Sequence, residues 1–442
     1  MEILTQAAQF VLSLSILIVL HEMGHMLPAK WFKTRVEKFY LFFDAGFSLF
    51  KFKKGETEYG IGWIPLGGYV KISGMIDESM DKEQMKEPAK PWEFRSKPAW
   101  QRLIIMTGGV TVNLILGYVI YIMMLFVWGS DYLPNQNVKY GAHLSHEIFE
   151  EYGFQEGDLI TSIDGQKIEE FGDASKKIII DGGREITLLR NGQNKRIILP
   201  ESIVEDMLRL KVKGVFSEWR TPNIIAQIEP GKFAETAGLL EGDSIVGIND
   251  VSTPFYVDFK KEIINHKSDT INIKFYRNSL INNLDVAVNE EGLIGYVSKH
   301  PTELLDFTHK DYGFFESIPA GIVEGTSTLT NYVKSIGLIF SKEGAKQIGG
   351  FGTIGSLYGK VWDWQRFWGM TALLSIILAF MNILPIPALD GGHVMFLIYE
   401  IISGKPPSDK FLTKAQVVGM VILLSLLVYA NGMDIFRWIS GS

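Results

Sequence analysis

The stretch I-L-I-V-L-H-E-M-G-H-M-L-P-A-K, from Ile16 to Lys30, decides the fold of this chain. No charged residue occurs between positions 7 and 20, and the apolar run continues directly into His21. A run of this length predicts a helix that spans a membrane, from about Ile3 to Ala29. On such a helix His21 and His25 lie four residues apart on one face, so both imidazoles can reach one metal ion.

Glu22 completes the pattern H-E-x-x-H, which zinc peptidases carry. Its carboxylate is placed to take a proton from a water bound at the metal, since a catalytic zinc keeps one position open beside its protein ligands. Two histidines on a helix can also be ordinary surface residues. That alternative is weak here, because ionisable side chains at membrane depth are costly and usually functional. The motif predicts a zinc site in which Glu22 is the general base.

Composition narrows the class of protein. The 442 residues are 47% hydrophobic and mean hydropathy is +0.12, which fits a few spanning helices joined to polar domains. The net charge of −7 is spread without long blocks of one sign, so no nucleic-acid partner is expected. The chain has no cysteine, which excludes disulfides, thiolate zinc ligands and a cysteine nucleophile. The N-terminus lacks a basic region and a cleavage site, so the first span is expected to be retained.

Three further apolar runs predict spans, at 103–128, 367–389 and about 415–430. The fold class is therefore a four-helix membrane protein that carries additional β-rich parts. Lysine and arginine gather between the first two spans, which places this loop in the cytoplasm and the N-terminus outside. The expected divisions are 1–30 (first span), 31–99 (cytoplasmic loop), 100–130 (second span), 131–215 and 216–300 (two modules), 301–360 (amphipathic helix and loop), 361–392 (third span) and 393–442 (loop and fourth span).

The cytoplasmic loop contains two aromatic, β-branched runs, at 39–52 and 59–72, separated by a turn at 53–56. They predict a β-hairpin or small sheet that lies against the membrane. Within the second run, P-L-G-G-Y-V-K-I begins at Pro65, and its two glycines allow a close backbone approach before an extended edge. The local sequence leaves two alternatives open: an ordinary hairpin turn, or an edge that captures an extended peptide by strand addition.

The third apolar run ends in N-I-L-P-I-P-A-L-D-G-G-H, residues 382–393. Two prolines near the end of a span leave backbone groups that protein or a cavity must satisfy. Asp390 is then a carboxylate at membrane depth, where a partner is expected. Alternating span directions and a rise of about 1.5 Å per residue place Asp390 at the depth of the two histidines, as a third ligand. His393 is the rival third ligand and is expected to lie exposed or behind the ligands.

The middle of the chain repeats itself. G-F-Q-E-G-D-L-I begins at Gly153 and G-L-L-E-G-D-S-I begins 85 residues later, at Gly238. A short helical stretch precedes each copy, and strand-like runs follow at 185–189 and 270–275. These features predict two β-rich modules, and the span directions place both modules outside the cytoplasm.

Both copies resemble the signature of PDZ domains. The second copy matches it closely from Ala237 to Asn249, whereas the first has Tyr152-Gly153-Phe154 where Ala-Gly-Leu is usual. PDZ domains bind peptides by strand addition, and the alternative is a purely structural spacer. After the modules, residues 312–340 have helical periodicity but are too polar to span, so they are expected to lie on the membrane surface. Residues 349–355 are expected to form a flexible loop.

Together, H-E-x-G-H, P-L-G-G-Y-V-K-I, the PDZ-like repeats and N-x-x-P-x-P-x-L-D-G-G resemble the site-2 protease family of intramembrane zinc metalloproteases, over essentially the whole chain. The resemblance implies that zinc is held by His21, His25 and Asp390. It implies a substrate-binding set of Asn382, Pro385, Pro387, Gly67, Gly68 and Tyr69. Asn113 matches a family position, although Val110 replaces a usual proline, and Asn431 and Asp434 resemble a polar pair that follows the fourth span.

The resemblance also implies a function. The expected activity is regulated intramembrane proteolysis in a bacterial inner membrane. The expected substrates are single-span proteins, such as an anti-sigma factor already trimmed outside, and remnant signal peptides. The PDZ-like modules are expected to restrict access by acting as a size filter. The rival is a membrane PDZ scaffold with a vestigial metal site. The intact Glu22 argues against this rival, because a scaffold gains nothing from a buried general base.

Overall fold

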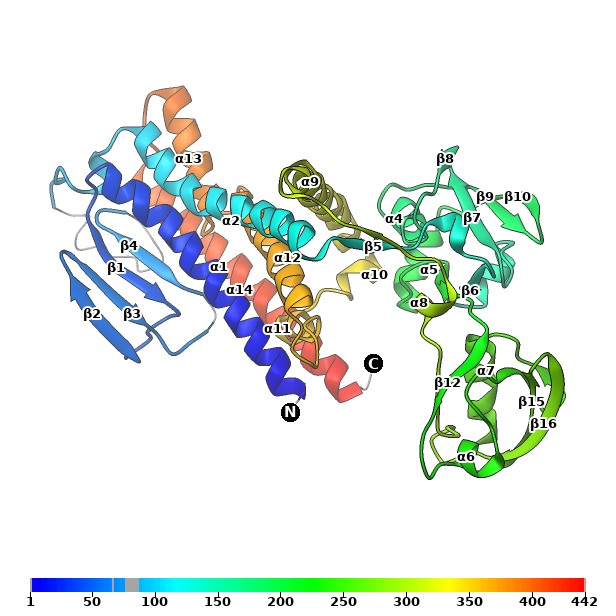
Figure 1. Ribbon diagram of the computed structural model, residues 1–442. Coiled ribbons are helices and arrows are strands. Elements are labelled where there is room, and N and C mark those ends of the chain that lie inside the picture. Colours follow the sequence, from blue (N-terminus) through cyan, green and yellow to red (C-terminus); the bar gives the residue numbers. More distant parts are fainter. Residues whose placement is uncertain (1, 66, 76–86, 441–442) are drawn as a thin grey trace. The chain divides into compact units, whose positions relative to one another are not determined.

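A computed structural model describes residues 2–65, 67–75 and 87–440 (Figure 1). Leu66 of the P-L-G-G-Y-V-K-I motif lies outside the described residues. The chain divides into two compact units, which are described separately. The membrane unit comprises residues 1–129, 311–340 and 345–442, and the repeat unit comprises residues 130–310 and 341–344.

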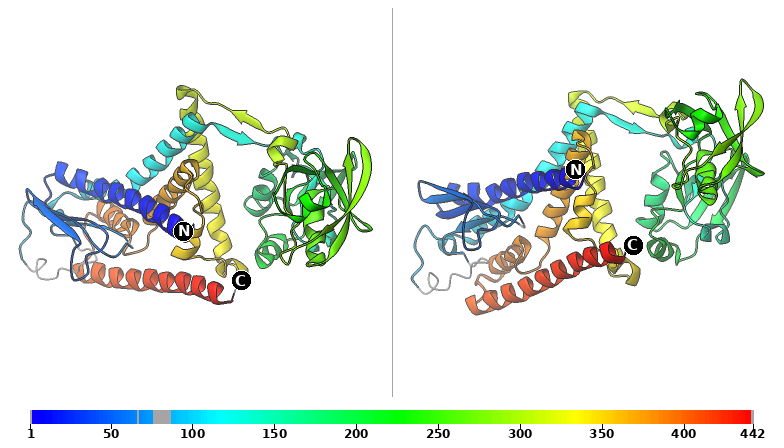
Figure 2. Two further views of the ribbon diagram at one scale, coloured as in Figure 1. Left: turned by 60° about the horizontal axis from the view of Figure 1, so that its bottom comes forward. Right: turned by 90° about the horizontal axis from the view of Figure 1, so that it is seen from below.

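Four helices of the membrane unit are long and apolar enough to cross a membrane, which confirms the predicted number of spans within the described residues. They are α1 (Glu2–Trp31), α2 (Ala99–Trp128), α12 (Trp364–Ile383) and α14 (Asp409–Ser440). Helix α2 packs against both α1 and α12 (Figure 2). A Cβ on Gly24 of α1 would lie 2.5 Å from the carbonyl oxygen of Gly108 on α2. Glycine at both positions lets the two helix backbones touch.

The predicted end of the third span is wrong. Helix α12 ends at Ile383, before both prolines, and a loop of residues 384–389 leads to a separate helix, α13 (Asp390–Ser403). The two prolines have no N–H to continue the helix, and Ala388 has a φ of +79°. Asp390 therefore begins a new helix, where its carboxylate suits the positive end of the helix dipole. Residues 393–403 continue this helix, so the loop expected from residue 393 onward is confined to residues 404–408.

The predicted small sheet between the first two spans is confirmed. It contains β1 (Val36–Leu41), β2 (Phe50–Lys54), β3 (Thr57–Ile61) and β4 (Tyr69–Ile72), in the order β2-β3-β1-β4. The predicted turn joins β2 to β3 as an antiparallel hairpin, and Gly55 in this turn has a φ of +66°. Strand β1 pairs parallel with β3 and antiparallel with β4. Among the described residues, β4 is an edge strand, and it contacts α1.

The segment expected on the membrane surface is helix α9 (Phe314–Ile339), which packs against α2 and α12. Gly321 and Gly325 form its contact face, because a Cβ at either position would clash with α2. The short helices α10 (Lys342–Ala345) and α11 (Phe351–Ser356) follow. The expected flexible loop at 349–355 is thus largely helical. Asn431 and Asp434 accept hydrogen bonds from backbone N–H groups of α11, and they lie inside α14, not after it.

The repeat unit contains two modules whose elements follow the same order, except that the first has an additional helix, α5, before its last strand. The first module comprises β6 (Ala142–Leu144), α3 (Ile148–Glu151), β7 (Leu159–Ile163), β8 (Gln166–Lys167), α4 (Asp173–Ile179), β9 (Glu185–Arg190), β10 (Gln193–Ile198), α5 (Ile203–Leu210) and β11 (Phe216–Trp219). The second comprises β12 (Asn223–Ile228), α6 (Phe233–Ala237), β13 (Ser244–Ile248), β14 (Val251–Ser252), α7 (Tyr256–Ile263), β15 (Thr270–Arg277), β16 (Leu280–Ala287) and β17 (Tyr296–Ser298). Before and after them, β5 (Ser130–Tyr132) pairs with β18 (Thr308–Lys310), and α8 (Pro301–Leu304) precedes β18.

Equivalent contacts show that the two modules are structural repeats. In the first, Arg190 binds the buried Asp158 through Nε and Nη2 at 2.8 and 2.7 Å. In the second, Arg277 binds the buried Asp243 in the same way, at 2.7 and 2.6 Å. Each module has its own apolar core. The predicted boundary at residue 216 is wrong by one strand, because β11 pairs with β6 and completes the first module.

Candidate active site

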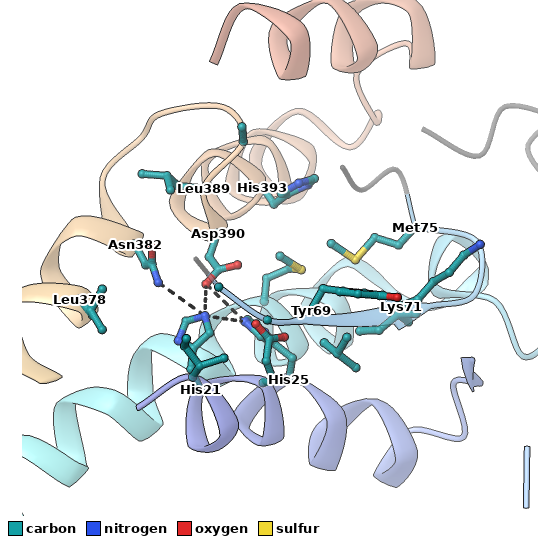
Figure 3. A pocket seen from close by; sticks show the side chains of 18 of the residues that line it. His21, His25, Tyr69, Lys71, Met75, Leu378, Asn382, Leu389, Asp390 and His393 are labelled. Atoms are coloured by element: carbon teal, nitrogen blue, oxygen red, sulfur yellow. Dashed lines mark hydrogen bonds and ion pairs between the residues drawn. The ribbon is translucent and has the colours of Figure 1, made fainter. Parts of the chain in front are cut away.

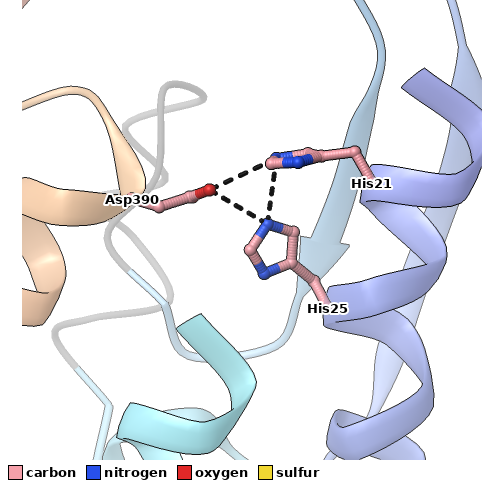
Figure 4. A group of neighbouring side chains, drawn as sticks. All are labelled: His21, His25 and Asp390. Carbon is pink, nitrogen blue, oxygen red and sulfur yellow. Dashed lines mark hydrogen bonds and ion pairs between the residues drawn. The ribbon is translucent and has the colours of Figure 1, made fainter. Parts of the chain in front are cut away.

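Three predicted ligand side chains meet in the membrane unit (Figure 4). His21 and His25 come from one face of α1, and Asp390 comes from the first turn of α13. The two Nε2 atoms are 3.3 Å apart. The Oδ2 atom of Asp390 lies 3.2 Å from Nε2 of His21 and 3.3 Å from Nε2 of His25. The three ligand atoms form a nearly equilateral triangle, although His21 and Asp390 are 369 positions apart in the sequence.

The triangle has the dimensions of a zinc site. Zinc binds nitrogen and oxygen ligands at about 2.0–2.1 Å in tetrahedral geometry, so two ligand atoms are about 3.3–3.4 Å apart. The Nδ1–H of His25 donates to the carbonyl oxygen of Ile105 at 2.8 Å, which leaves Nε2 without a proton in the neutral ring. Oδ2 of Asp390 is buried and receives no hydrogen bond from the described residues. Together with Nε2 of His21, these two atoms form a set of three close ligand atoms that fits a cation.

The second span, α2, packs directly against the two histidine rings of this site. A Cβ on Gly109 would lie 2.4 Å from Nε2 of His25 and 2.7 Å from Cε1 of His21. Only glycine lets the backbone of α2 pass this close to both rings. One turn further along α2, the side-chain amide of Asn113 lies 3.3 Å from Nδ1 of His21. The glycine at this position of α2 therefore leaves room for the two imidazoles.

A cavity of about 640 Å³ opens onto the three ligand atoms (Figure 3). Its walls come from α1, α2, α12, α13, α14 and the sheet. Glu22 lines the cavity, and its carboxyl group is within hydrogen-bonding reach of the backbone of Val70 on β4. Gly68, just before β4, would carry a Cβ only 2.5 Å from Cγ2 of Ile18 on α1. The glycine thus brings the edge strand against the helix that holds Glu22.

The other predicted residues divide into two groups. Gly67, Gly68, Tyr69 and Asn382 line the cavity, and Nδ2 of Asn382 lies 3.5 Å from Nε2 of His21. Pro385 and Pro387 shape the loop between α12 and α13 and are not among the described residues that form the cavity wall. His393 also lines the cavity, one turn after Asp390, but it does not belong to the group of three close ligand atoms.

Some cavity residues were missed by sequence reasoning. Lys38 reaches the cavity from β1, Asp44 reaches it from the loop between β1 and β2, and Gln416 reaches it from the fourth span. The Tyr69 hydroxyl donates to Oδ1 of Asp44 at 2.9 Å. Burial, and then this hydrogen bond, raise the pKa of Tyr69 well above its ordinary value, so the phenol stays protonated and keeps donating. The signal for Gln416 was present as a polar residue within an apolar run.

Comparison with known proteins identifies the class of this site. The model of peptidase family M50 matches residues 9–426, and the chain therefore belongs to that family. The chain is a zinc-dependent metalloprotease of the site-2 type. It is a membrane protein in which four helices have the length and apolar character of spans.

Named relatives extend over nearly the full length of the chain. The regulator of sigma E protease of Haemophilus influenzae is 27% identical over 99% of this chain and 100% of its own. Protease RseP of Yersinia pestis is 26% identical over the same shares of both chains. A protein of Xylella fastidiosa, provisionally named a zinc metalloprotease, is 29% identical over 96% of this chain and 97% of its own. The resemblance inferred from the motifs thus leads to the same family.

Proposed function

We propose that this protein cleaves single-span membrane proteins within a bacterial inner membrane, in regulated intramembrane proteolysis. The observation that carries the proposal is the convergence of α1, α13 and the edge strand β4 on one cavity. His21, His25 and Asp390 meet there beside Glu22. The relative named regulator of sigma E protease favours anti-sigma factor-like proteins as substrates. Remnant signal peptides are a second candidate class, since they are also single apolar helices.

The chain's own residues supply distinct steps. His21, His25 and Asp390 would hold zinc. When bound, zinc would act as a Lewis acid that polarises the scissile carbonyl and lowers the pKa of a water molecule. The Glu22 carboxylate takes the proton from the attacking water and delivers it to the leaving amine nitrogen. Asn382 lies beside His21 and can donate its amide N–H to a substrate carbonyl.

Substrate binding follows from the position of β4. A helical substrate keeps its carbonyls in hydrogen bonds, so it must unwind before attack. Strand β4 has one edge paired with β1 and runs past Glu22. Its other edge pairs with no strand among the described residues, so an unwound segment can add to the sheet there by strand addition, which presents the backbone of the segment to the general base. Gly67, Gly68 and Tyr69 would then contact the bound segment, and the hydrogen bond to Asp44 fixes the tyrosine ring.

We assign the two modules of the repeat unit as PDZ domains, on their signature and their repeated element order. The positive-inside rule places them outside the cytoplasm and the zinc site near the cytoplasmic face. Their proposed role is to restrict access, so that a substrate with a bulky outer domain is excluded and a trimmed one is admitted. Besides substrates, the expected partner is membrane lipid.

The test compares Glu22→Gln with the wild type in membranes. The variant should retain zinc, because Glu22 is not a ligand, and should lose peptide hydrolysis by about 10²- to 10⁴-fold or more. Mass spectrometry of membrane peptides that accumulate with the variant then identifies substrates. If zinc is lost together with activity, Glu22 has another role. If the variant remains as active as the wild type, the chain does not act by this chemistry and the scaffold alternative is favoured.

A further inference from the structure

Gln416 is a buried polar side chain near the start of the fourth span. It is 4% exposed, and its Oε1 accepts a hydrogen bond from the backbone N–H of Ala388 at 3.2 Å. One turn later on α14, a Cβ on Gly419 would lie 1.6 Å from the carbonyl oxygen of Pro387. The fourth span therefore touches the loop before Asp390 in two ways, through a hydrogen bond and through a close backbone contact.

Ala388 occupies a conformation that needs such support. Its φ of +79° lies in the left-handed region, which residues with a Cβ rarely adopt. Leu389 follows, and Asp390 is the next residue and the first of α13. A rotation at Ala388 would therefore move the Asp390 carboxylate relative to the two histidines. A well-formed metal site keeps its ligand distances within about 0.2 Å of the usual values, so the conformation of this loop affects affinity for the ion.

We infer that Gln416 is a positioning residue for Asp390. By holding the N–H of Ala388, it keeps the loop in its strained conformation and the Oδ2 of Asp390 at 3.2 and 3.3 Å from the histidine nitrogens. The fourth span thus takes part in the metal site although it supplies no ligand. The inference rests on the proposed function, because it requires Asp390 to bind zinc.

A competing role is direct contact with substrate, since Gln416, Ala388 and Asp390 all line the same cavity. The two roles differ in what they change. A positioning residue changes affinity for zinc in the absence of substrate. A substrate contact changes KM and leaves zinc affinity unaltered. The natural measurement is therefore zinc affinity, determined by chelator competition on the full-length protein in lipid nanodiscs.

Four variants form the first test. Gln416→Met removes the acceptor at similar size, Gln416→Glu keeps an oxygen, and Val417→Met changes the next, exposed residue as a control. Gln416→Met should weaken zinc affinity about tenfold, and the other two should stay within about threefold of the wild type. Gly419→Ala should weaken zinc affinity as well, because its Cβ pushes α14 away from Pro387. Zinc-free Gln416→Met and Val417→Met should unfold at the same temperature.

A rescue provides the second test. Glycine adopts positive φ without steric cost, so the loop of Ala388→Gly needs less support. In that background, Gln416→Met should lose clearly less zinc affinity than it does in the wild type. The inference is overturned if Gln416→Met leaves zinc affinity unchanged and only raises KM, or if Ala388→Gly gives no rescue. Asp390→Ala in the same assay distinguishes failure of this inference from failure of the proposed function. If that variant keeps its zinc, the proposed ligand set itself is wrong.

Discussion

The side-chain amide of Asn113, on the second span, lies 3.3 Å from Nδ1 of His21, and its Oδ1 is buried without a hydrogen-bond partner among the described residues. A histidine that binds metal through Nε2 carries its proton on Nδ1. The atom at 3.3 Å is Nδ2, and a flip of the amide puts Oδ1 in its place, where Oδ1 accepts a hydrogen bond from the Nδ1–H of His21. His25 obtains the same result from the carbonyl oxygen of Ile105. The second span thus directs both imidazoles.

Asn113→Leu should therefore weaken zinc affinity by about 10- to 100-fold, as is usual for the hydrogen-bond partner of a ligand histidine. Asn113→Asp keeps an oxygen acceptor at the same place and should bind zinc about as well as the wild type. Chelator competition measures both variants. Equal affinity of Asn113→Leu and the wild type would show that packing alone orients His21.

Asp390→Ala should lower zinc affinity by more than about 100-fold, beyond the range expected for a residue that only supports a ligand. The reason is the convergence of its Oδ2 with both histidine nitrogens. His393→Ala is the matched control, since His393 lines the same cavity one turn later on α13. Metal analysis of the two purified variants decides the assignment, and a reversed result would make His393 the third ligand.

Gly68→Ala should reduce peptide hydrolysis by about 100-fold, because a displacement of about 1 Å near a reacting group can cost that much. A Cβ there would lie 2.5 Å from Cγ2 of Ile18 and 2.6 Å from the carbonyl oxygen of Tyr40, so β4 must move away from α1. Zinc affinity should not change. Gly337→Ala in α9 is the control, since nothing lies within 4 Å of its added Cβ. Unchanged hydrolysis by Gly68→Ala would contradict substrate binding at this edge.

Replacing residues 133–307 by a flexible linker between β5 and β18 tests the size filter. The linker variant should cleave an untrimmed substrate that the wild type rejects, and it should still cleave the trimmed form. The reason is that exclusion depends on the repeat unit, whereas the proposed chemistry lies within the membrane unit. If a folded, zinc-loaded variant no longer cleaves the trimmed form, the modules deliver substrates and do not exclude them.

Arg277→Ala should destabilise the second module by roughly 3 kcal/mol, because it leaves the carboxylate of Asp243 buried without its bidentate partner. Hydrogen exchange should accelerate in this module, between residues 223 and 298. Arg190→Ala is the matched variant, and it should act on the first module through Asp158. Faster exchange spread equally over both modules would show that they unfold as one unit.

Several features depend on sequence alone because they are local. The spacing of His21 and His25 on a helix, the length of the apolar runs and the repeat of G-x-x-E-G-D are all set by neighbouring residues. The turn at Gly55 and the strands around it are local in the same sense. These patterns predicted four spans, a small sheet, two similar modules and the H-E-x-x-H half of the site before any tertiary contact was considered.

The rest of the site depends on contacts between distant residues. Asp390 was expected at the depth of the histidines on one helix that continued through the prolines, whereas α12 ends at Ile383 and α13 begins at Asp390. The hydrogen bond from Ala388 to Gln416 and the passage of Gly109 beside the two rings join distant segments, so the sequence does not indicate either contact, although Gln416 stands out as a polar residue in an apolar run. Tertiary structure decided them, because a positive φ or a close backbone approach is stable only where another part of the chain holds it.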